Sequence, residues 1–138
     1  QPGDAKSSDD AGEWFIVSHV HHGNVLVLMD LPSHRPLGIA ILMRDWNDPD
    51  RCYLSDFGVK EGYRGRGLGT YFLEVALDEA RRMNLKSVSL TVDVNNRAAI
   101  GLYRKFGFEI IDERRNLYGE GRHRYFMDLE VMPASRNS

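Results

Sequence analysis

Between residues 64 and 70 the chain reads Arg64-Gly65-Arg66-Gly67-Leu68-Gly69-Thr70, after an apolar strand-like run and before an amphipathic helical pattern. Alternating glycines at a helix entrance leave backbone N–H groups accessible, and the helix N-terminus adds a partial positive charge. The two arginines contribute fixed positive charge and forked hydrogen-bond donors. This stretch therefore predicts a loop that binds a phosphate group.

Two widespread phosphate-binding loops do not fit this spacing. A P-loop ends in Gly-Lys followed by Ser or Thr, and the chain contains no Gly-Lys pair. A dinucleotide-binding loop needs Gly-x-Gly-x-x-Gly, but the third position after Gly65 and Gly67 is Thr70. The pattern that remains is Arg-x-x-Gly-x-Gly, which runs from Arg64 to Gly69.

A second block follows downstream and reads Asn96-Arg97-Ala98-Ala99-Ile100-Gly101-Leu102-Tyr103-Arg104-Lys105-Phe106-Gly107-Phe108. Together the two blocks resemble the signatures of the GCN5-related N-acetyltransferases (GNAT): a pyrophosphate loop, then Asn-x-x-Ala-x-x-Leu-Tyr followed by Gly-Phe. The resemblance covers about residues 25 to 130. Within the family, the stretch from Ser89 to Tyr103 is most similar to the branch that acetylates protein N-termini, ribosomal proteins included.

Composition bounds the class of protein. The chain has 138 residues, of which 42% are hydrophobic, so one domain with a single core is expected. A net charge of −2 argues against a globally basic nucleic-acid binder. The single cysteine, Cys52, cannot form an internal disulfide, which favours a reducing, cytoplasmic location. No apolar run approaches the roughly 18 residues needed to cross a membrane.

Hydrophobic periodicity predicts an α/β (α+β) fold, and the resemblance implies that it is GNAT-like. A strand, helix and strand around the glycine-rich stretch form a central parallel unit within a mixed, mostly antiparallel sheet, with helices on both faces. Asn95 or Asn96 caps the second helix, and Gly107 ends it. The expected elements are strands at Trp14–Val20, Val25–Asp30, Leu37–Arg44 and Cys52–Val59, a helix at 67–83, a strand at 87–94, a helix at 97–106, and strands at Phe108–Glu113 and His123–Glu130.

The domain boundaries follow from composition and from the resemblance. Residues 1–12 have the composition of a flexible tail or linker, residues 13–134 form the acetyltransferase domain, and 135–138 form a tail. The chain begins with Gln1, which favours a domain excised from a longer protein. Family members usually place a strand and two helices before the strand that corresponds to Val25–Asp30, so the acceptor half is expected to be abbreviated, or completed by a homodimer partner or a larger parent chain.

The resemblance implies that the cofactor is acetyl-CoA. The glycine-rich loop would hold its pyrophosphate, and the end of the preceding strand would pair with the pantetheine arm as an added strand does. The predicted cofactor-binding residues are Phe57, Gly58, Val59, Arg64, Gly65, Arg66, Gly67, Leu68, Gly69, Thr70, Asn96, Ala99 and Tyr103.

The resemblance assigns Tyr103 as the general acid that protonates the leaving thiolate. A phenol with an ordinary pKa of about 10 remains protonated at neutral pH and can give its proton to a thiolate. A core tyrosine whose hydroxyl bonds a backbone group is the structural alternative. We predict the catalytic role.

The general base remains open among several residues. Tyr53 matches a family position that carries glutamate or tyrosine, whereas Thr91 matches one that carries glutamate or histidine and cannot itself act as a base. The remaining candidates are Tyr53 acting through a water, Asp56, Asp93 and His123. We predict Tyr53 and Asp93 as catalytic.

Several other polar residues have less specific patterns. The predicted substrate-binding residues are Tyr53, Ser55, Thr91 and Tyr118; the last lies in a loop that resembles the acceptor-contacting hairpin of N-terminal acetyltransferases, with an ordinary solvated basic hairpin as the alternative. The cluster His19, His21 and His22 matches no zinc pattern, so we expect no metal.

These observations predict an N-acetyltransferase, an acyltransferase enzyme that acetylates a primary amine by direct attack in a ternary complex. The acceptor is a protein N-terminus or a small amine, and the sequence leaves that choice open. The alternative is a non-catalytic CoA-binding or interaction domain of a larger protein.

Overall fold

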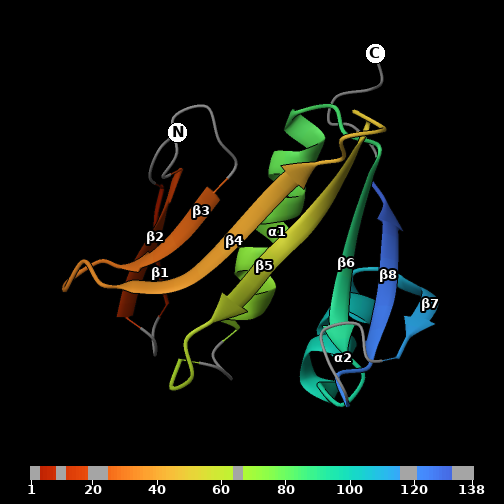
Figure 1. Ribbon diagram of the computed structural model, residues 1–138. Coiled ribbons are helices and arrows are strands. Elements are labelled where there is room, and N and C mark those ends of the chain that lie inside the picture. The colour runs from red at the N-terminus through yellow and green to blue at the C-terminus, as the bar shows by residue number, and fades with distance from the viewer. Residues whose placement is uncertain (1–3, 9–11, 19–24, 64–66, 116–120, 132–138) are drawn as a thin grey trace. The chain divides into compact units, whose positions relative to one another are not determined.

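The computed structural model describes residues 4–8, 12–18, 25–63, 67–115 and 121–131 (Figure 1). The chain divides into two compact units: Gln1–Met43 with Ser55–Ala76, and Arg44–Leu54 with Leu77–Ser138. The elements in chain order are β1 (Asp4–Ser8), β2 (Gly12–Ser18), β3 (Val25–Asp30), β4 (Pro36–Arg44), β5 (Arg51–Val59), α1 (Leu68–Arg82), β6 (Ser87–Asp93), α2 (Arg97–Lys105), β7 (Glu109–Arg114) and β8 (Arg124–Glu130).

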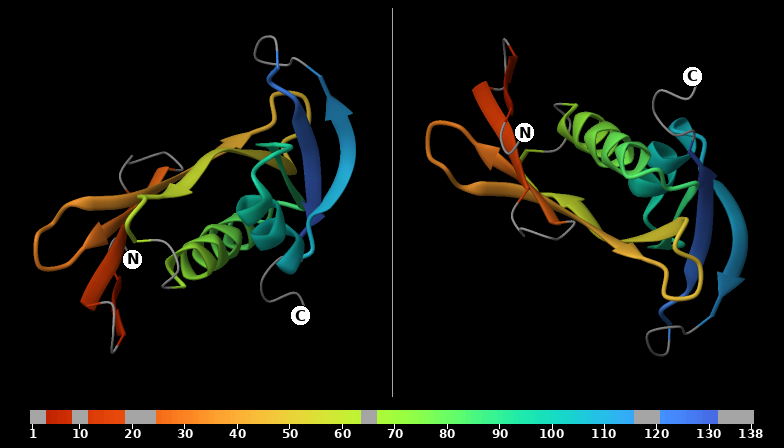
Figure 2. Two further views of the ribbon diagram at one scale, coloured as in Figure 1. Left: turned by 90° about the horizontal axis from the view of Figure 1, so that it is seen from below. Right: turned by 90° about the horizontal axis from the view of Figure 1, so that it is seen from above.

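The first unit is an antiparallel layer in the order β1-β2-β3-β4, followed by residues 55–59 of β5. Residues 68–76 of α1 cover one face of this layer (Figure 2). The core forms where apolar side chains of the strands meet the helix face. Its buried residues are Trp14, Ile16, Leu26, Leu28, Leu37, Ala40, Leu42, Val59, Leu68, Phe72, Leu73 and Ala76.

The second unit contains the one parallel strand pair of the described sheet. Residues 51–53 of β5 run parallel to 87–89 of β6, and β6 pairs antiparallel with β8 over its whole length. β7 and β8 form the last antiparallel pair, and α2 lies against one face of these strands in both views of Figure 2. The buried residues here are Cys52, Leu54, Leu77, Ala80, Leu85, Val88, Leu90, Val92, Tyr103, Phe108, Met127 and Val131.

The predicted fold class is confirmed: the sheet is mixed, mostly antiparallel, and accompanied by helices. The predicted elements lie within a few residues of the observed ones. One strand was not predicted: β1 lies inside residues 1–12, whose composition predicted a linker, and pairs with β2 from Asp4↔Ile16 to Ser8↔Gly12. Pairing with a neighbouring strand, rather than local composition, makes this segment a strand.

The two ends of α2 follow the predicted signals. The Asn96 side chain caps the helix by accepting a hydrogen bond from the backbone N–H of Ala99 at 3.1 Å. At the other end Gly107 has a φ of 103°, in the left-handed region that glycine adopts without strain. The N–H groups of Gly107 and Phe108 donate to the carbonyls of Arg104 and Tyr103, which is a Schellman motif.

In the first unit β4 and β5 approach closely at Gly38. A Cβ atom there would lie 2.7 Å from the backbone oxygen of Gly58 and 3.2 Å from the Phe72 ring. Because a backbone oxygen and a fully buried ring cannot easily move aside, a side chain at this position forces the strand and helix to shift.

We therefore expect Gly38→Ala to lower the free energy of unfolding by about 1–3 kcal/mol. The matched control is Gly101→Ala on the exposed side of α2, where a Cβ would meet nothing within 4 Å. That control should stabilise the protein by about 0.5–1 kcal/mol, because glycine is unfavourable inside a helix. Urea unfolding of both variants measures the difference, and equal effects would contradict the close approach at Gly38.

Candidate functional site

The N-terminus of α1 lies directly after the glycine-rich stretch. Gly67 has a φ of 77°, and the helix begins at Leu68, whose side chain is buried and anchors this end. The first turn of an α-helix has backbone N–H groups without intrahelical partners, and here it carries no acidic side chain. These features suit an anionic group such as a phosphate. Three predicted residues of the loop, Arg64, Gly65 and Arg66, lie outside the described residues.

The end of β5 provides the other predicted cofactor-binding residues of this unit. Phe57 packs against the ring of Phe72 with 5.5 Å between ring centroids, and Val59 is buried. The N–H of Lys60 donates to the carbonyl of Leu37 at 2.6 Å, which fixes the end of the strand against β4. Ser55 is half-buried on the same strand.

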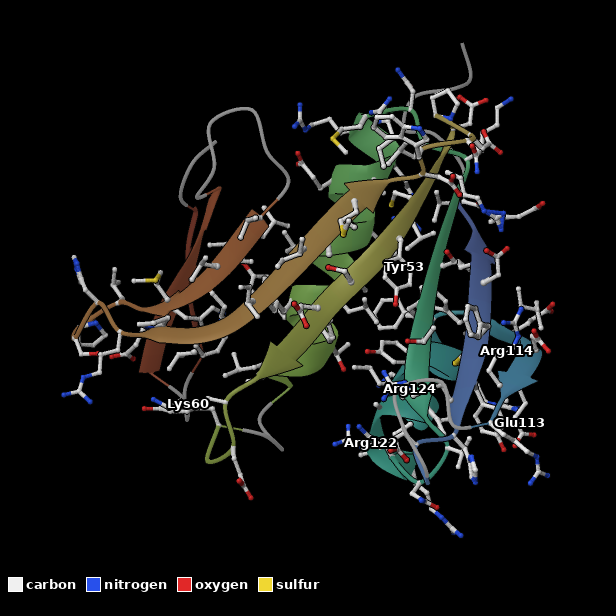
Figure 3. The ribbon with its side chains drawn as sticks, in the orientation of Figure 1. Tyr53, Lys60, Glu113, Arg114, Arg122 and Arg124 are labelled. Carbon is white, nitrogen blue, oxygen red and sulfur yellow. The ribbon has the colours of Figure 1, made fainter. Side chains whose placement is uncertain are left out.

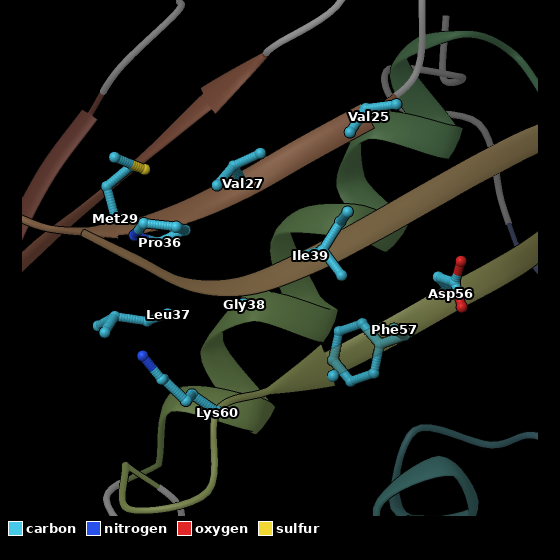
Figure 4. A pocket seen from close by; sticks show the side chains of 11 residues that line it. Val25, Val27, Met29, Pro36, Leu37, Gly38, Ile39, Asp56, Phe57 and Lys60 are labelled. Atoms are coloured by element: carbon cyan, nitrogen blue, oxygen red, sulfur yellow. The ribbon is translucent and has the colours of Figure 1, made fainter. Parts of the chain in front are cut away.

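A pocket of about 710 Å³ lies on the face of this layer that is turned away from α1 (Figure 4). Val25 and Val27 of β3 and Ile39 of β4 form its floor, and Asp56 and Lys60 are its charged residues. The Ile39 side chain is 41% exposed, which is more than its neighbours on the strand, Gly38 and Ala40. Phe57 and Gly58, both predicted to bind the cofactor, also line this pocket.

In the second unit the Schellman motif fixes the position of Tyr103. Its carbonyl accepts the hydrogen bond from Phe108, and the two rings pack with centroids 5.6 Å apart. The side chain is only 6% exposed. Burial raises the pKa of Tyr103 to about 12, and the positive charge of Arg124 acts in the opposite direction. The phenol is therefore protonated throughout the neutral range and has a proton to donate.

Tyr53 and Thr91 meet on the polar face of the second unit. The Tyr53 hydroxyl and Thr91 Oγ1 are joined by a hydrogen bond of 3.2 Å. Arg124, from β8, donates from Nη2 to the backbone oxygen of Thr91 at 3.2 Å and to its Oγ1 at 3.3 Å. In Figure 3 the Tyr53 side chain extends along β6 towards Arg124. The structure thus brings together two predicted substrate-binding residues and one residue that was not predicted.

The other candidates for the general base have structural contacts of their own. Asp93 Oδ1 accepts a hydrogen bond from the N–H of Asn95 at 2.8 Å, which shapes the turn before α2. The carbonyl of His123 accepts from the N–H of Val94 at 3.2 Å. Asp56 lines the pocket of the first unit. Asn96 and Ala99 form the cap of α2, and their cofactor-binding roles remain predictions.

Cys52 is buried, and desolvation raises the pKa of its thiol to about 11. Within the described ranges no group of three or more His, Cys, Asp and Glu side chains is placed to bind a metal. His19, His21, His22 and Tyr118 lie outside those ranges. None of the described helices is long and apolar enough to cross a bilayer.

Arg124 is the functional candidate that the sequence did not reveal. The alternation of β8 places it on the same face as Phe126 and Asp128, and the strand register aligns it with Asp93 of β6. The alternation is visible in the sequence. The antiparallel register of β6 with β8, which joins residues 33 positions apart, is not.

Comparison with known proteins finds relatives of this chain. A model of the acetyltransferase (GNAT) family matches residues 3–108. The N-alpha-acetyltransferase daf-31 of Caenorhabditis elegans is 30% identical over 131 residues, which cover 90% of this chain and 67% of that protein. The probable N-acetyltransferase san of Drosophila melanogaster is 39% identical over 69 residues, 49% of this chain; the match spans only 38% of that relative.

Solved structures share the fold. Ard1 from Thermoplasma volcanium has a TM-score of 0.72 and 26% identity, covering 79% of this chain and 71% of that one. Arabidopsis thaliana Naa50, in complex with the bisubstrate analogue CoA-Ac-MVNAL, has a TM-score of 0.64 and 30% identity, covering 77% and 72%.

The raised pKa of Tyr103 predicts a loss of stability at high pH. Between the ordinary pKa of about 10 and the folded value of about 12, the unfolded tyrosine releases its proton while the folded one keeps it. The free energy of unfolding should therefore fall by about 2–3 kcal/mol over this interval and be unaffected by Tyr103 titration below pH 9. Denaturant titrations of the wild type and of Tyr103→Phe test this, because the variant should show a correspondingly shallower decline. Parallel curves would contradict it.

Proposed function

The chain belongs to the acetyltransferase (GNAT) family, and we propose that it is an acetyl-CoA-dependent N-acetyltransferase whose acceptor is the α-amino group of a peptide. The observation that carries the chemistry is Tyr103: a buried, protonated phenol held by the C-terminal motif of α2. The peptide acceptor is supported by relatives named as N-alpha-acetyltransferases and by the peptide-bearing analogue bound to the Naa50 neighbour. A small amine is the second acceptor class.

The residues around α1 and β5 suit the phosphates and the pantetheine arm of coenzyme A. The first turn of α1, Leu68 to Thr70, offers N–H groups and no competing carboxylate. The N-terminal partial charge of a fifteen-residue helix favours the pyrophosphate there. Phe57 to Val59 would pair along the pantetheine arm. Acetyl-CoA supplies the acetyl thioester when bound.

The proposed reaction balances with the residues at hand. The neutral amine attacks the thioester carbon, the new N–C bond forms, and the C–S bond breaks. Tyr103 gives its proton to the leaving thiolate and recovers one from solvent. The proton lost by the amine leaves through a water held by Tyr53.

We further place the protein in the cytoplasm, because its one cysteine is a buried thiol.

Thiol release from acetyl-CoA, followed with a chromogenic reagent, tests the proposal. The acceptors are pools of short peptides with free N-termini, polyamines, amino acids and aminoglycosides. We expect release with the peptide pool, and we expect Tyr103→Phe to lower kcat by about 100-fold or more, because a general acid contributes about this much. The native protein should add no signal of its own, since Cys52 is buried and its pKa is raised to about 11.

The contrary outcome has a clear form. If the protein binds acetyl-CoA but releases no thiol with any pool, it is a CoA-binding or interaction domain and the proposed function is wrong. Release with the polyamine pool alone would establish the enzyme and replace the peptide by a small amine.

A further inference from the structure

The guanidinium of Arg124 is the group that links the polar residues of the second unit. It donates from one nitrogen, Nη2, to both oxygens of a single residue, Thr91. The Thr91 hydroxyl in turn shares a hydrogen bond with Tyr53. One cation from β8 therefore reaches, through a threonine of β6, to a tyrosine of β5.

The chemistry of the three groups determines which of them donates and which accepts in these hydrogen bonds. Arginine can only donate, so Thr91 Oγ1 accepts from Arg124. A hydroxyl that accepts from a cation becomes a better donor, and this favours donation from Thr91 to the Tyr53 oxygen. In that arrangement the Thr91 hydroxyl holds the Tyr53 oxygen and so fixes where the phenol lies.

Arg124 differs in its hydrogen-bond partners from Arg114, the arginine beside it. Arg114 of β7 is its direct cross-strand neighbour, but its Nε donates to Asp112 at 2.8 Å and its guanidinium lies 5.3 Å from the centre of the Phe126 ring. Figure 3 shows Arg114 on the side of β8 away from Tyr53. Two arginines at paired positions thus have separate partners, and only Arg124 turns to β6.

The positive charge of Arg124 also opposes the effect of burial on the pKa of Tyr103. A phenol that donates its proton becomes negative until it is reprotonated, and a nearby cation stabilises that charge. The same guanidinium therefore bears on both tyrosines that we predict to be catalytic.

We propose that Arg124 is a positioning residue of the acetyl-transfer site, which holds Thr91 and through it the phenol of Tyr53. This inference rests on the proposed function, since it assigns a role within that reaction. It adds a residue to which neither of the two sequence motifs points.

The test compares Arg124→Gln with Arg114→Gln, which remove the same charge from the two members of one cross-strand pair. We expect Arg124→Gln to lower kcat by at least about tenfold, since small displacements of a catalytic group are costly, and to change the KM for acetyl-CoA by less than about twofold. Arg114→Gln should leave both constants within about twofold of the wild type. Arg124→Lys, which keeps the charge and a donor, should recover part of the rate.

A double-mutant cycle separates positioning from general stability. If Arg124 acts through Tyr53, Arg124→Gln should cost less in kcat when Tyr53 is already phenylalanine. Equal losses in both backgrounds, or an Arg124→Gln enzyme as fast as the wild type, would overturn the proposal. Should Arg124→Gln fail to fold, Thr91→Val against Thr91→Ser tests the same link, because only the serine retains the hydroxyl; equal rates in those two would be equally decisive.

The wild type distinguishes this failure from failure of the proposed function. A wild-type protein that turns over acetyl-CoA with peptides while the Arg124 variants match it retains the function and loses only the role of Arg124. A wild-type protein that releases no thiol with any acceptor contradicts the function first.

Discussion

The strict alternation of β6 is the constraint on which the second unit depends. Val88, Leu90 and Val92 are each at most 4% exposed, and burial of such side chains contributes about 1.5–3 kcal/mol apiece. Because successive side chains of a strand point to opposite faces, Thr91 must then lie on the polar face. A slip of one residue would bury Thr91 and expose the valines, so the core fixes the register of the site.

The same register determines what Thr91 can meet. β6 pairs with β8 over seven residues, which puts Thr91 opposite Phe126 and Asp93 opposite Arg124. A long side chain at the position of Arg124 can reach back along the strand to Thr91, and it does so with two hydrogen bonds. On the other side, the short parallel pairing of β5 with β6 aligns Tyr53 with Ser89. The strand pairing that packs the core therefore also assembles the polar cluster of Tyr53, Thr91 and Arg124.

Local patterns in the sequence predicted most of the fold, because they report local physics. The period of the apolar residues gave the strands and both helices, and Asn96 and Gly107 marked the ends of α2 through their own hydrogen bonds and backbone angle. The strand β1 was not predicted, because it forms by pairing with β2 and its own composition does not indicate a strand. Arg124 was not predicted as a site residue for a similar reason. Its contact with Thr91 depends on the register between two strands, which no single segment of the sequence contains. Residues 64–66, which carry much of the predicted phosphate loop, lie outside the described part of the chain.

The presence of threonine at position 91 has a physical explanation in Arg124. A carboxylate this close to a guanidinium would be stabilised in its charged form, its pKa would fall, and it would be a weak base. An imidazole there would meet the same cation and resist protonation. A hydroxyl avoids both effects, since it accepts from the arginine and can donate to Tyr53 without any change of charge. Tyr103 differs in its surroundings: it is buried and keeps its proton although the charge of Arg124 acts on it, whereas Tyr53 is hydrogen-bonded to Thr91, which accepts from Arg124.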